Sequence, residues 1–223
     1  MRIAVVGSGI SGLSSAYYLS KKHKVDLFEK EDRFGGHSYT LDVEYSDKEK
    51  VAVDIGFMVF NKITYPNLIN FFKENEIEIE KSDMSFSVNV KETNIEYCGK
   101  GLKGIFSNKL NLFNYKFVKM FFEIINFYKR CENLDPNTLE DNITLGEYLK
   151  KIKKTNYFID YHIIPMVSAI WSIPPYEASQ MPFTFFLNFF KNHGLFKIKN
   201  RPQWFTVSNR SKIYVNKILS NIS

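Results

Sequence analysis

The sequence is poor in cysteine and has no long apolar run. Only two cysteines, Cys98 and Cys131, occur among its 223 residues, and neither belongs to a pair at metal-ligand spacing. We therefore predict neither a metal site nor a disulfide framework, and a reducing cytoplasm fits this usage. No window approaches the roughly 18 apolar residues that a membrane span requires. The first apolar residues run directly into glycines, so we also expect no signal peptide.

Two functional classes are disfavoured by what the sequence lacks. The formal net charge of +6 is spread as single lysines among carboxylates and asparagines. Because no basic cluster adjoins a recognisable reading element, we expect no nucleic-acid partner. No nucleophile-elbow pattern is present, so hydrolase chemistry has no support. His162 and His193 lie on apolar helical patterns, where a structural histidine is more common than an acid or base.

The chain does have enough apolar sequence for a packed core. Its 44% hydrophobic and 24% charged residues are ordinary for a globular protein with one large domain or two small ones. The aromatic share of 16% is high. These side chains could line an apolar cavity as well as fill a core, and composition does not separate the two.

The opening stretch predicts a nucleotide-binding β-α-β unit. After an apolar strand pattern, Gly7, Gly9 and Gly12 match G-x-G-x-x-G and open a helical pattern over residues 10–21. The first glycine permits a tight turn, the second lets a pyrophosphate approach the backbone, and the third lets the helix pack on the strand. Ser11 lies at the helix N-terminus, where N–H groups favour an anion.

A carboxylate ends the second strand pattern, residues 24–29. Glu29 follows the turn by about 20 residues, so it is placed to accept hydrogen bonds from a ribose diol. A carboxylate there disfavours a 2′-phosphate, which makes NADP the least favoured dinucleotide. The competing interpretation is a glycine-rich turn between packing elements, with Glu29 simply exposed.

The next loop distinguishes FAD from NAD by resemblance. Arg33, followed by Gly35 and Gly36, resembles the R-x-G-G motif of the flavin-containing amine oxidase and phytoene desaturase superfamily. The glycines let the backbone come close to a ligand, and Arg33 can neutralise a phosphate oxygen. A flexible surface loop is the alternative. The resemblance implies that the cofactor is FAD.

A third strand pattern breaks at Gly56. In the superfamily a D-x-G at such a place lies beside the flavin end of the cofactor, which makes Gly56 and Phe57 candidate contacts. Asp54 could equally cap a turn.

The resemblance extends over essentially the whole chain. Segments such as PMVSAIWSIPP and RPQWFTV are similar to those of a bacterial branch of FAD-dependent amine-oxidase-like oxidoreductases. His37 departs from the arginine that many members carry, and Ser208-Asn209 replaces an expected Gly-Gly pair. The superfamily completes its cofactor domain with a C-terminal portion. The resemblance therefore implies the N-terminal half of a longer enzyme, whose missing half is needed to complete the site.

The expected fold class is α/β, a Rossmann-like FAD-binding domain with a mainly helical substrate or cap domain inserted. We expect residues 1–60 and 201–223 to belong to the cofactor domain and residues 61–200 to form the insert. The patterns predict the following elements: helices at 65–74, 114–130, 163–171 and 182–191, a hairpin at 85–97, a loop at 99–104, a capping box from Thr144 to Glu147 opening a helix of about ten residues, and a short helix from Lys212. The helix at 114–130 could lie on a membrane surface or pack in the cap domain, and packing is favoured.

The resemblance implies an FAD-dependent oxidoreductase in which a small organic substrate gives a hydride to flavin. The cofactor carries such chemistry, which explains why no conventional catalytic residue is evident. Phe57, Trp171, Tyr176 and the cluster at 183–190 suggest an apolar substrate such as a lipid, a polyene or an amine with an apolar tail. Two alternatives stay open: a flavin-dependent isomerase or mutase without net redox, and a truncated, non-catalytic nucleotide-binding fragment.

Overall fold

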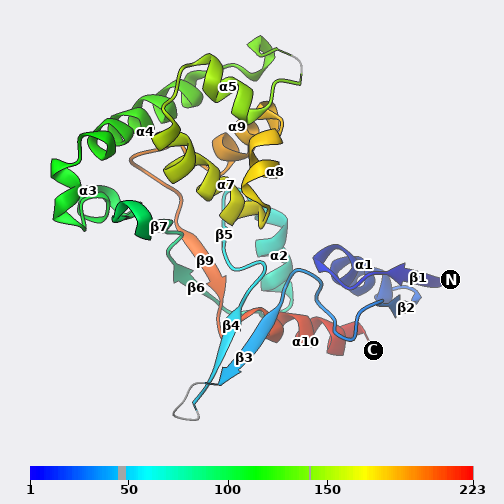
Figure 1. The fold of residues 1–223 in the computed structure, drawn as a ribbon. Helices are drawn as coiled ribbons and strands as arrows, with labels where there is room; N and C mark the ends of the chain where they lie inside the picture. The colour runs from blue at the N-terminus through cyan, green and yellow to red at the C-terminus, as the bar shows by residue number, and fades with distance from the viewer. Residues whose placement is uncertain (45–48, 141, 223) are drawn as a thin grey trace. The chain divides into compact units, whose positions relative to one another are not determined.

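The computed structural model describes residues 1–44, 49–140 and 142–222, which form two compact units (Figure 1). Unit 1 comprises residues 1–84 and 202–223, and unit 2 comprises residues 85–201. A mainly helical unit is thus inserted into an α/β unit, as the sequence predicts. Among the described residues, no helix is both long enough and apolar enough to cross a bilayer.

Unit 1 opens with the predicted strand, helix and strand. They are β1 (Arg2–Val6), α1 (Ile10–Ser20) and β2 (Lys24–Phe28), and the two strands pair in parallel. On α1, Leu13 and Ala16 are buried. A parallel pair joined by a crossover helix is the Rossmann-like unit that the glycine pattern predicts.

The rest of unit 1 brings distant segments together. Its elements are β3 (Thr40–Glu44) paired antiparallel with β4 (Lys50–Asp54), the sheet β5 (Phe60–Asn61), β9 (Trp204–Val207) and β6 (Ile79–Ser82), and the helices α2 (Pro66–Glu74) and α10 (Ser211–Ile222). The boundary between the units falls at Met84 instead of residue 60. The reason is that Phe72 of α2 is buried against Tyr214 of α10, and β6 pairs with β9.

Unit 2 consists of a hairpin and a set of helices. They are β7 (Ser87–Val90), β8 (Ile95–Cys98), α3 (Gly101–Ile105), α4 (Tyr115–Asn133), α5 (Leu145–Lys151), α6 (Asn156–Phe158), α7 (Ile164–Trp171), α8 (Pro175–Gln180) and α9 (Phe183–Asn192), with a 3₁₀ segment η2 (Lys109–Phe113) and a π-helical turn η4 (Ile159–Ile163). The predicted hairpin and the helices that became α4, α7 and α9 are confirmed. The predicted capping box is also confirmed, although α5 has seven residues.

The loop predicted at 99–104 is wrong, because α3 forms there. Gly101 opens the helix with a φ of +67°. A Cβ added to Gly104 would lie 2.6 Å from the carbonyl oxygen of Cys98. Gly104 therefore allows the helix to pack closely on the end of β8, and a glycine-rich stretch that resembles a loop becomes a tightly docked helix.

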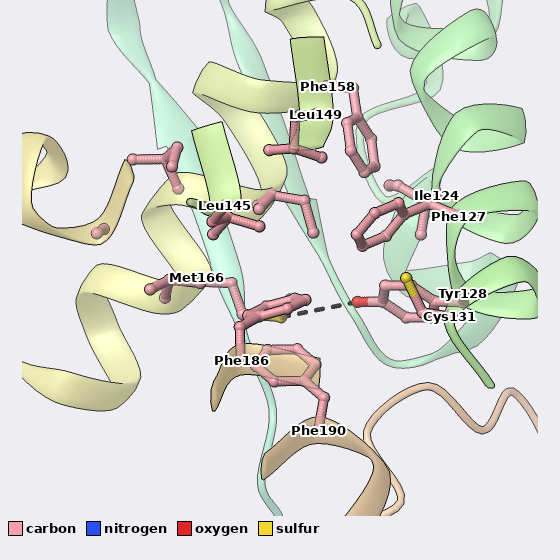
Figure 2. Packing of buried hydrophobic residues seen from close by; sticks show 14 of the residues in the cluster. Ile124, Phe127, Tyr128, Cys131, Leu145, Leu149, Phe158, Met166, Phe186 and Phe190 are labelled. Carbon is pink, nitrogen blue, oxygen red and sulfur yellow. Dashed lines mark hydrogen bonds between the residues drawn. The ribbon is translucent and has the colours of Figure 1, made fainter. Parts of the chain in front are cut away.

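Aromatic side chains fill the core of unit 2 (Figure 2). The ring of Phe127 of α4 lies 6.3 Å from that of Phe186 of α9, which lies 4.1 Å from that of Phe190, centroid to centroid, and all three residues are fully buried. The hydroxyl oxygen of Tyr128 lies 3.7 Å from the sulfur of Met166. At these positions the high aromatic content serves packing instead of lining a cavity.

Candidate functional site

The glycine loop between β1 and α1 has a different geometry at each glycine. Gly7 takes a φ of +89°, which favours glycine. A Cβ added to Gly12 would lie 1.8 Å from the carbonyl oxygen of Gly7, so the helix could not pack this closely with any other residue. A Cβ added to Gly9 would meet no atom within 4 Å. The backbone is therefore tightly packed at Gly12, whereas the space next to Gly9 is free of protein atoms.

The N-terminus of α1 lies at this open side. Gly9 is its N-cap, none of the described side chains caps it by a hydrogen bond, and its first turn contains no acidic residue. The first N–H groups of a helix lack partners inside the helix, and the helix dipole adds partial positive charge there. This arrangement suits a diphosphate.

Ser8, between the first two glycines, links three segments of the site. It is fully buried, and its backbone N–H donates to Oε2 of Glu29 at 2.8 Å. Its hydroxyl also donates to Oε2 of Glu29. The backbone N–H of Gly35 donates to the carbonyl oxygen and the hydroxyl of Ser8, each at 3.1 Å. Sequence reasoning missed this residue, and its only signal is a small hydroxyl side chain inside the glycine motif.

Glu29 points back toward the glycine loop. Its Oε1 accepts hydrogen bonds from the backbone N–H groups of Lys30 and Glu31, at 2.7 and 3.1 Å. The hydrogen bond from the Ser8 hydroxyl, followed by those from backbone N–H groups, lowers the pKa of Glu29 to about 2. The carboxylate is therefore charged at neutral pH and fixed in orientation beside the loop. Four donors already occupy its roughly four lone-pair sites, so a further donor has to replace one of them, such as the Ser8 hydroxyl.

The second loop packs directly on the first. A Cβ added to Gly36 would lie 2.9 Å from Cα of Gly9, and one added to Gly35 would lie 2.8 Å from the carbonyl oxygen of Ser38. The Arg33 guanidinium lies over the Tyr39 ring, 3.8 Å from its centroid, and donates to the carbonyl oxygen of Gly36 at 2.8 Å. The glycine pair thus permits contact between loops, and Arg33 retains further N–H donors.

The D-x-G segment, residues 54–56, contacts both the Arg33 loop and the start of α10. The Asp54 carboxylate accepts hydrogen bonds from the backbone N–H and hydroxyl of Ser211, at 3.1 and 2.8 Å, so it caps α10. A Cβ added to Gly56 would lie 1.9 Å from the carbonyl oxygen of His37, which places Gly56 against the Arg33 loop. The ring of Phe57 turns into the core of unit 1 and stacks on Phe60, with centroids 6.2 Å apart.

Ser11 faces a hollow of about 510 Å³ between α1 and α2. The hollow is lined by Ser11, Ser14 and Tyr18 of α1 and by Asn67, Asn70 and Glu74 of α2, among others. Its lining includes Ile10, the first residue of α1, so it opens beside the glycine loop. The structure therefore brings Gly7, Gly9, Gly12, Glu29, Arg33, Gly35, Gly36 and Gly56 together, with Ser11 at the edge and Phe57 in the core behind.

Comparisons with known proteins agree with this geometry. Residues 5–74 match the family model described as an NAD(P)-binding Rossmann-like domain. Prenylcysteine oxidase 1 of Mus musculus is 54% identical over 52 residues, which are 22% of this chain and 10% of that protein. The flavin-containing amine oxidase A of Canis lupus familiaris is 35% identical over 97 residues, 43% of this chain and 16% of that protein.

A solved structure matches over the full length of the chain. Cyclohexylamine oxidase from Brevibacterium oxydans is 17% identical, with a TM-score of 0.63, over 100% of this chain and 49% of that one. The chain thus spans about half the length of this solved structure. The glycine loop, the matched Rossmann-like domain and these relatives together make the chain similar to proteins of the amine-oxidase-like superfamily.

Proposed function

We propose that the chain holds the AMP half of FAD at the glycine loop and serves an FAD-dependent oxidoreductase of the amine-oxidase type. The observation that carries this proposal is the open space above Gly9, bordered by the charged carboxylate of Glu29 that Ser8 fixes in place. The name of the flavin-containing amine oxidase relative supports flavin over a nicotinamide cofactor.

Each polar group of the site has a task in this proposal. The N–H groups at the start of α1 bind the diphosphate, and Glu29 accepts hydrogen bonds from the ribose hydroxyls in place of the Ser8 hydroxyl. The free N–H groups of Arg33 lie on the loop that packs against Gly9, where they bind a phosphate oxygen. Bound FAD would supply the hydride acceptor, so the chain itself provides binding and orientation.

We also propose that polypeptide outside these 223 residues completes the site. Among the described strands β1 pairs only with β2, Val6 is 84% exposed and Phe28 is 55% exposed. Parallel sheets normally have both faces covered, and two strands alone are marginally stable. The expected supplement is a further strand on β1 with a layer over Val6 and Phe28.

The substrate is proposed to be a small organic molecule with an apolar part. Support comes from aromatic side chains at the surface of unit 2, where Phe185 is 50% exposed and lies 5.6 Å from the Trp171 ring, centroid to centroid. A cytoplasmic location is proposed as well. It is supported by two free cysteines, Cys98 and Cys131, that form no disulfide in the described chain.

Substituting Gly9 with Ala tests the nucleotide site with little disturbance of the fold. Gly9 has a φ of −63° and a ψ of 176°, which alanine adopts freely, and its Cβ would enter the open space that a diphosphate needs. We expect at least about a tenfold loss of affinity for FAD or ADP, because backbone contacts at about 3 Å would be blocked. Isothermal titration calorimetry on the purified chain measures it, and thermal unfolding should be unchanged.

Gly99→Ala is the matched control, since its Cβ would meet only the carbonyl oxygen of Phe86 at an ordinary 3.5 Å in unit 2. It should leave nucleotide binding intact. A folded wild-type chain that binds neither FAD nor ADP, or a Gly9→Ala variant that binds as tightly as wild type, would refute the proposed site. Anaerobic bleaching of bound flavin by substrate would distinguish an oxidoreductase from an isomerase.

A further inference from the structure

The segment that precedes and begins α4 carries charge of one sign only. Residues 97–122 contain five lysines and no aspartate or glutamate. The lysines are Lys100, Lys103, Lys109, Lys116 and Lys119, and all five are exposed. Lys100 is the N-cap of α3, Lys103 lies on α3, Lys109 begins η2, and Lys116 and Lys119 lie on the first turns of α4.

Large apolar side chains are exposed among these lysines. Phe113 is 87% exposed and Tyr115 is 75% exposed. Together with these two, the exposed apolar residues that we define as the α3–α4 patch are Leu102, Leu110, Leu112 and Phe122. Large apolar side chains exposed together on neighbouring segments are a feature of interaction sites.

In η2 a polar side chain is buried and the apolar side chains are exposed, which is the opposite of the usual pattern. Its buried residue is the polar Asn111, whose side-chain amide donates to the carbonyl oxygen of Glu96 at 2.9 Å. Its apolar neighbours Leu110, Leu112 and Phe113 are exposed. A buried amide under exposed leucines and phenylalanine is the reverse of what folding alone favours.

The patch is held on a firm base. The ring of Phe106 packs between α3 and α4, with centroids 6.0 Å from Phe117 and 5.5 Å from Phe121. The side chain of Asn114 caps α4 by accepting from the backbone N–H groups of Lys116 and Phe117. Figure 1 shows α3 beside the beginning of α4 within unit 2. Most apolar side chains of α4 are buried, so α4 contributes only Tyr115 and Phe122 to the patch, and the segments before it contribute the other four residues.

We propose that the α3–α4 patch docks unit 2 on an anionic membrane surface. Leucine, phenylalanine and tyrosine side chains enter the boundary between headgroups and acyl chains, and the lysines contact lipid phosphates. A protein partner fits less well, because lysine is depleted in protein–protein interfaces whereas interfacial membrane elements mix lysine with aromatic and leucine side chains. This proposal is independent of the nucleotide site.

Vesicle co-sedimentation of the 223-residue chain tests this proposal directly. We expect binding to phosphatidylcholine vesicles that contain phosphatidylglycerol, little binding to phosphatidylcholine alone, and weakening as salt is raised. Phe113→Ser should lower the partition coefficient about tenfold, the scale expected for one inserted aromatic side chain. Tyr176→Ser is the matched control, because Tyr176 is 75% exposed in unit 2, against 87% for Phe113, but lies next to Glu177 outside the patch.

A charge pair of variants supplies a second readout. Lys109→Gln with Lys116→Gln should weaken binding to anionic vesicles by more than about fivefold, whereas Lys129→Gln with Lys150→Gln should not. Circular dichroism verifies folding of each variant. Absence of binding to anionic vesicles, or equal effects of patch and control variants, overturns the proposal. So does concentration-dependent self-association that Phe113→Ser abolishes, since it would assign the patch to a protein interface.

Discussion

At the scale of single residues, His162 shows how a buried polar group is satisfied without a catalytic task. Its Nδ1 lies 2.9 Å from the Tyr97 hydroxyl, which donates to the carbonyl oxygen of Tyr161 at 2.7 Å. Its Nε2 lies 3.0 Å from the Tyr128 hydroxyl. Because Tyr97 uses its only proton on the carbonyl, Nδ1 of His162 carries the imidazole proton and Nε2 accepts from Tyr128. The structural role expected for this histidine from its apolar surroundings agrees with the network.

The same network predicts a pH dependence of stability. Burial, aided by the positive charge of Arg201, lowers the pKa of His162 to about 3, from an ordinary value of 6.5. The unfolded chain therefore binds a proton that the folded chain rejects, and stability falls as pH decreases from about 6.5 toward 3. The slope contributed by His162 is at most about 1.4 kcal/mol per pH unit. Urea unfolding between pH 4 and 7 measures it.

The variant His162→Gln removes this titration, so its urea midpoint should depend less steeply on pH than that of the wild type. His193 contributes in the same direction, because burial also lowers its pKa, so part of the slope should remain. His37→Gln, at an exposed position, is the control and should retain the full slope. An unchanged slope in His162→Gln would show that the imidazole is solvated or already charged in the folded chain.

At the scale of elements, short sequence patterns predict those structures that depend on interactions between residues near each other in the chain. The β1–α1–β2 unit and the capping box of Thr144 and Glu147 follow from short-range spacing, and the structure confirms both. Contacts between distant segments were not predictable in this way. The Ser8 hydrogen bonds to Glu29 and Gly35 join residues more than 20 positions apart, and α3 forms where glycines resemble a loop.

The turn before α10 also depends on contacts that sequence patterns do not predict. An expected Gly-Gly pair is replaced by Ser208-Asn209, yet the backbone keeps a left-handed turn, with φ of 62° at Asn209 and 78° at Arg210. The Arg210 side chain donates to the carbonyl oxygen of Ala52 at 2.9 Å, which joins the turn to β4. The turn before α10 is therefore held by long-range contacts in addition to residue preference.

Asp54→Ala tests which of two roles this carboxylate has. As the cap of α10, its loss should destabilise unit 1 by about 1–2 kcal/mol, measured by urea unfolding, with no direct effect on nucleotide affinity. Asp42→Ala is the matched control: Asp42 lies on the same hairpin and pairs with Lys212 of the same helix at 2.6 Å, but both side chains are exposed. Such a pair contributes less than about 1 kcal/mol.

An Asp54→Ala variant as stable as the wild type but impaired in FAD binding would instead assign Asp54 to the flavin end of the site. Sequence resemblance alone left these two roles equal. The structure favours the cap because two donors of Ser211 and the hydroxyl of Thr40 already converge on the carboxylate.

At the scale of the whole molecule, the chain has two separate hydrophobic cores. One contains buried residues of unit 2 only, with Phe127, Phe158 and Phe186 among them. The other contains buried residues of unit 1 only, with Phe72 and Tyr214 among them. Composition was compatible with one large domain or two small ones. Which of the two forms depends on which distant segments share a core, and sequence periodicity does not predict such long-range contacts.

Because the cores are separate, we expect a substitution in one core to destabilise only the unit that contains it. Phe127 is fully buried in unit 2, so Phe127→Ala should cost about 3–5 kcal/mol of that unit's stability through lost contacts and a cavity. Hydrogen exchange measured by mass spectrometry should then show loss of protection in residues 85–201, with protection in α1 and α10 retained. Because the glycine loop belongs to unit 1, nucleotide binding should persist in this variant.

Phe72→Ala, at an equally buried position of unit 1, is the reciprocal variant. It should release protection in α1 and α10 and weaken nucleotide binding, while helices α4 and α9 stay protected. Loss of protection throughout the chain in either variant would mean that the two cores unfold as one cooperative unit. The glycine loop would then depend on the helical insert for its stability, and nucleotide affinity would fall in Phe127→Ala as steeply as in Phe72→Ala.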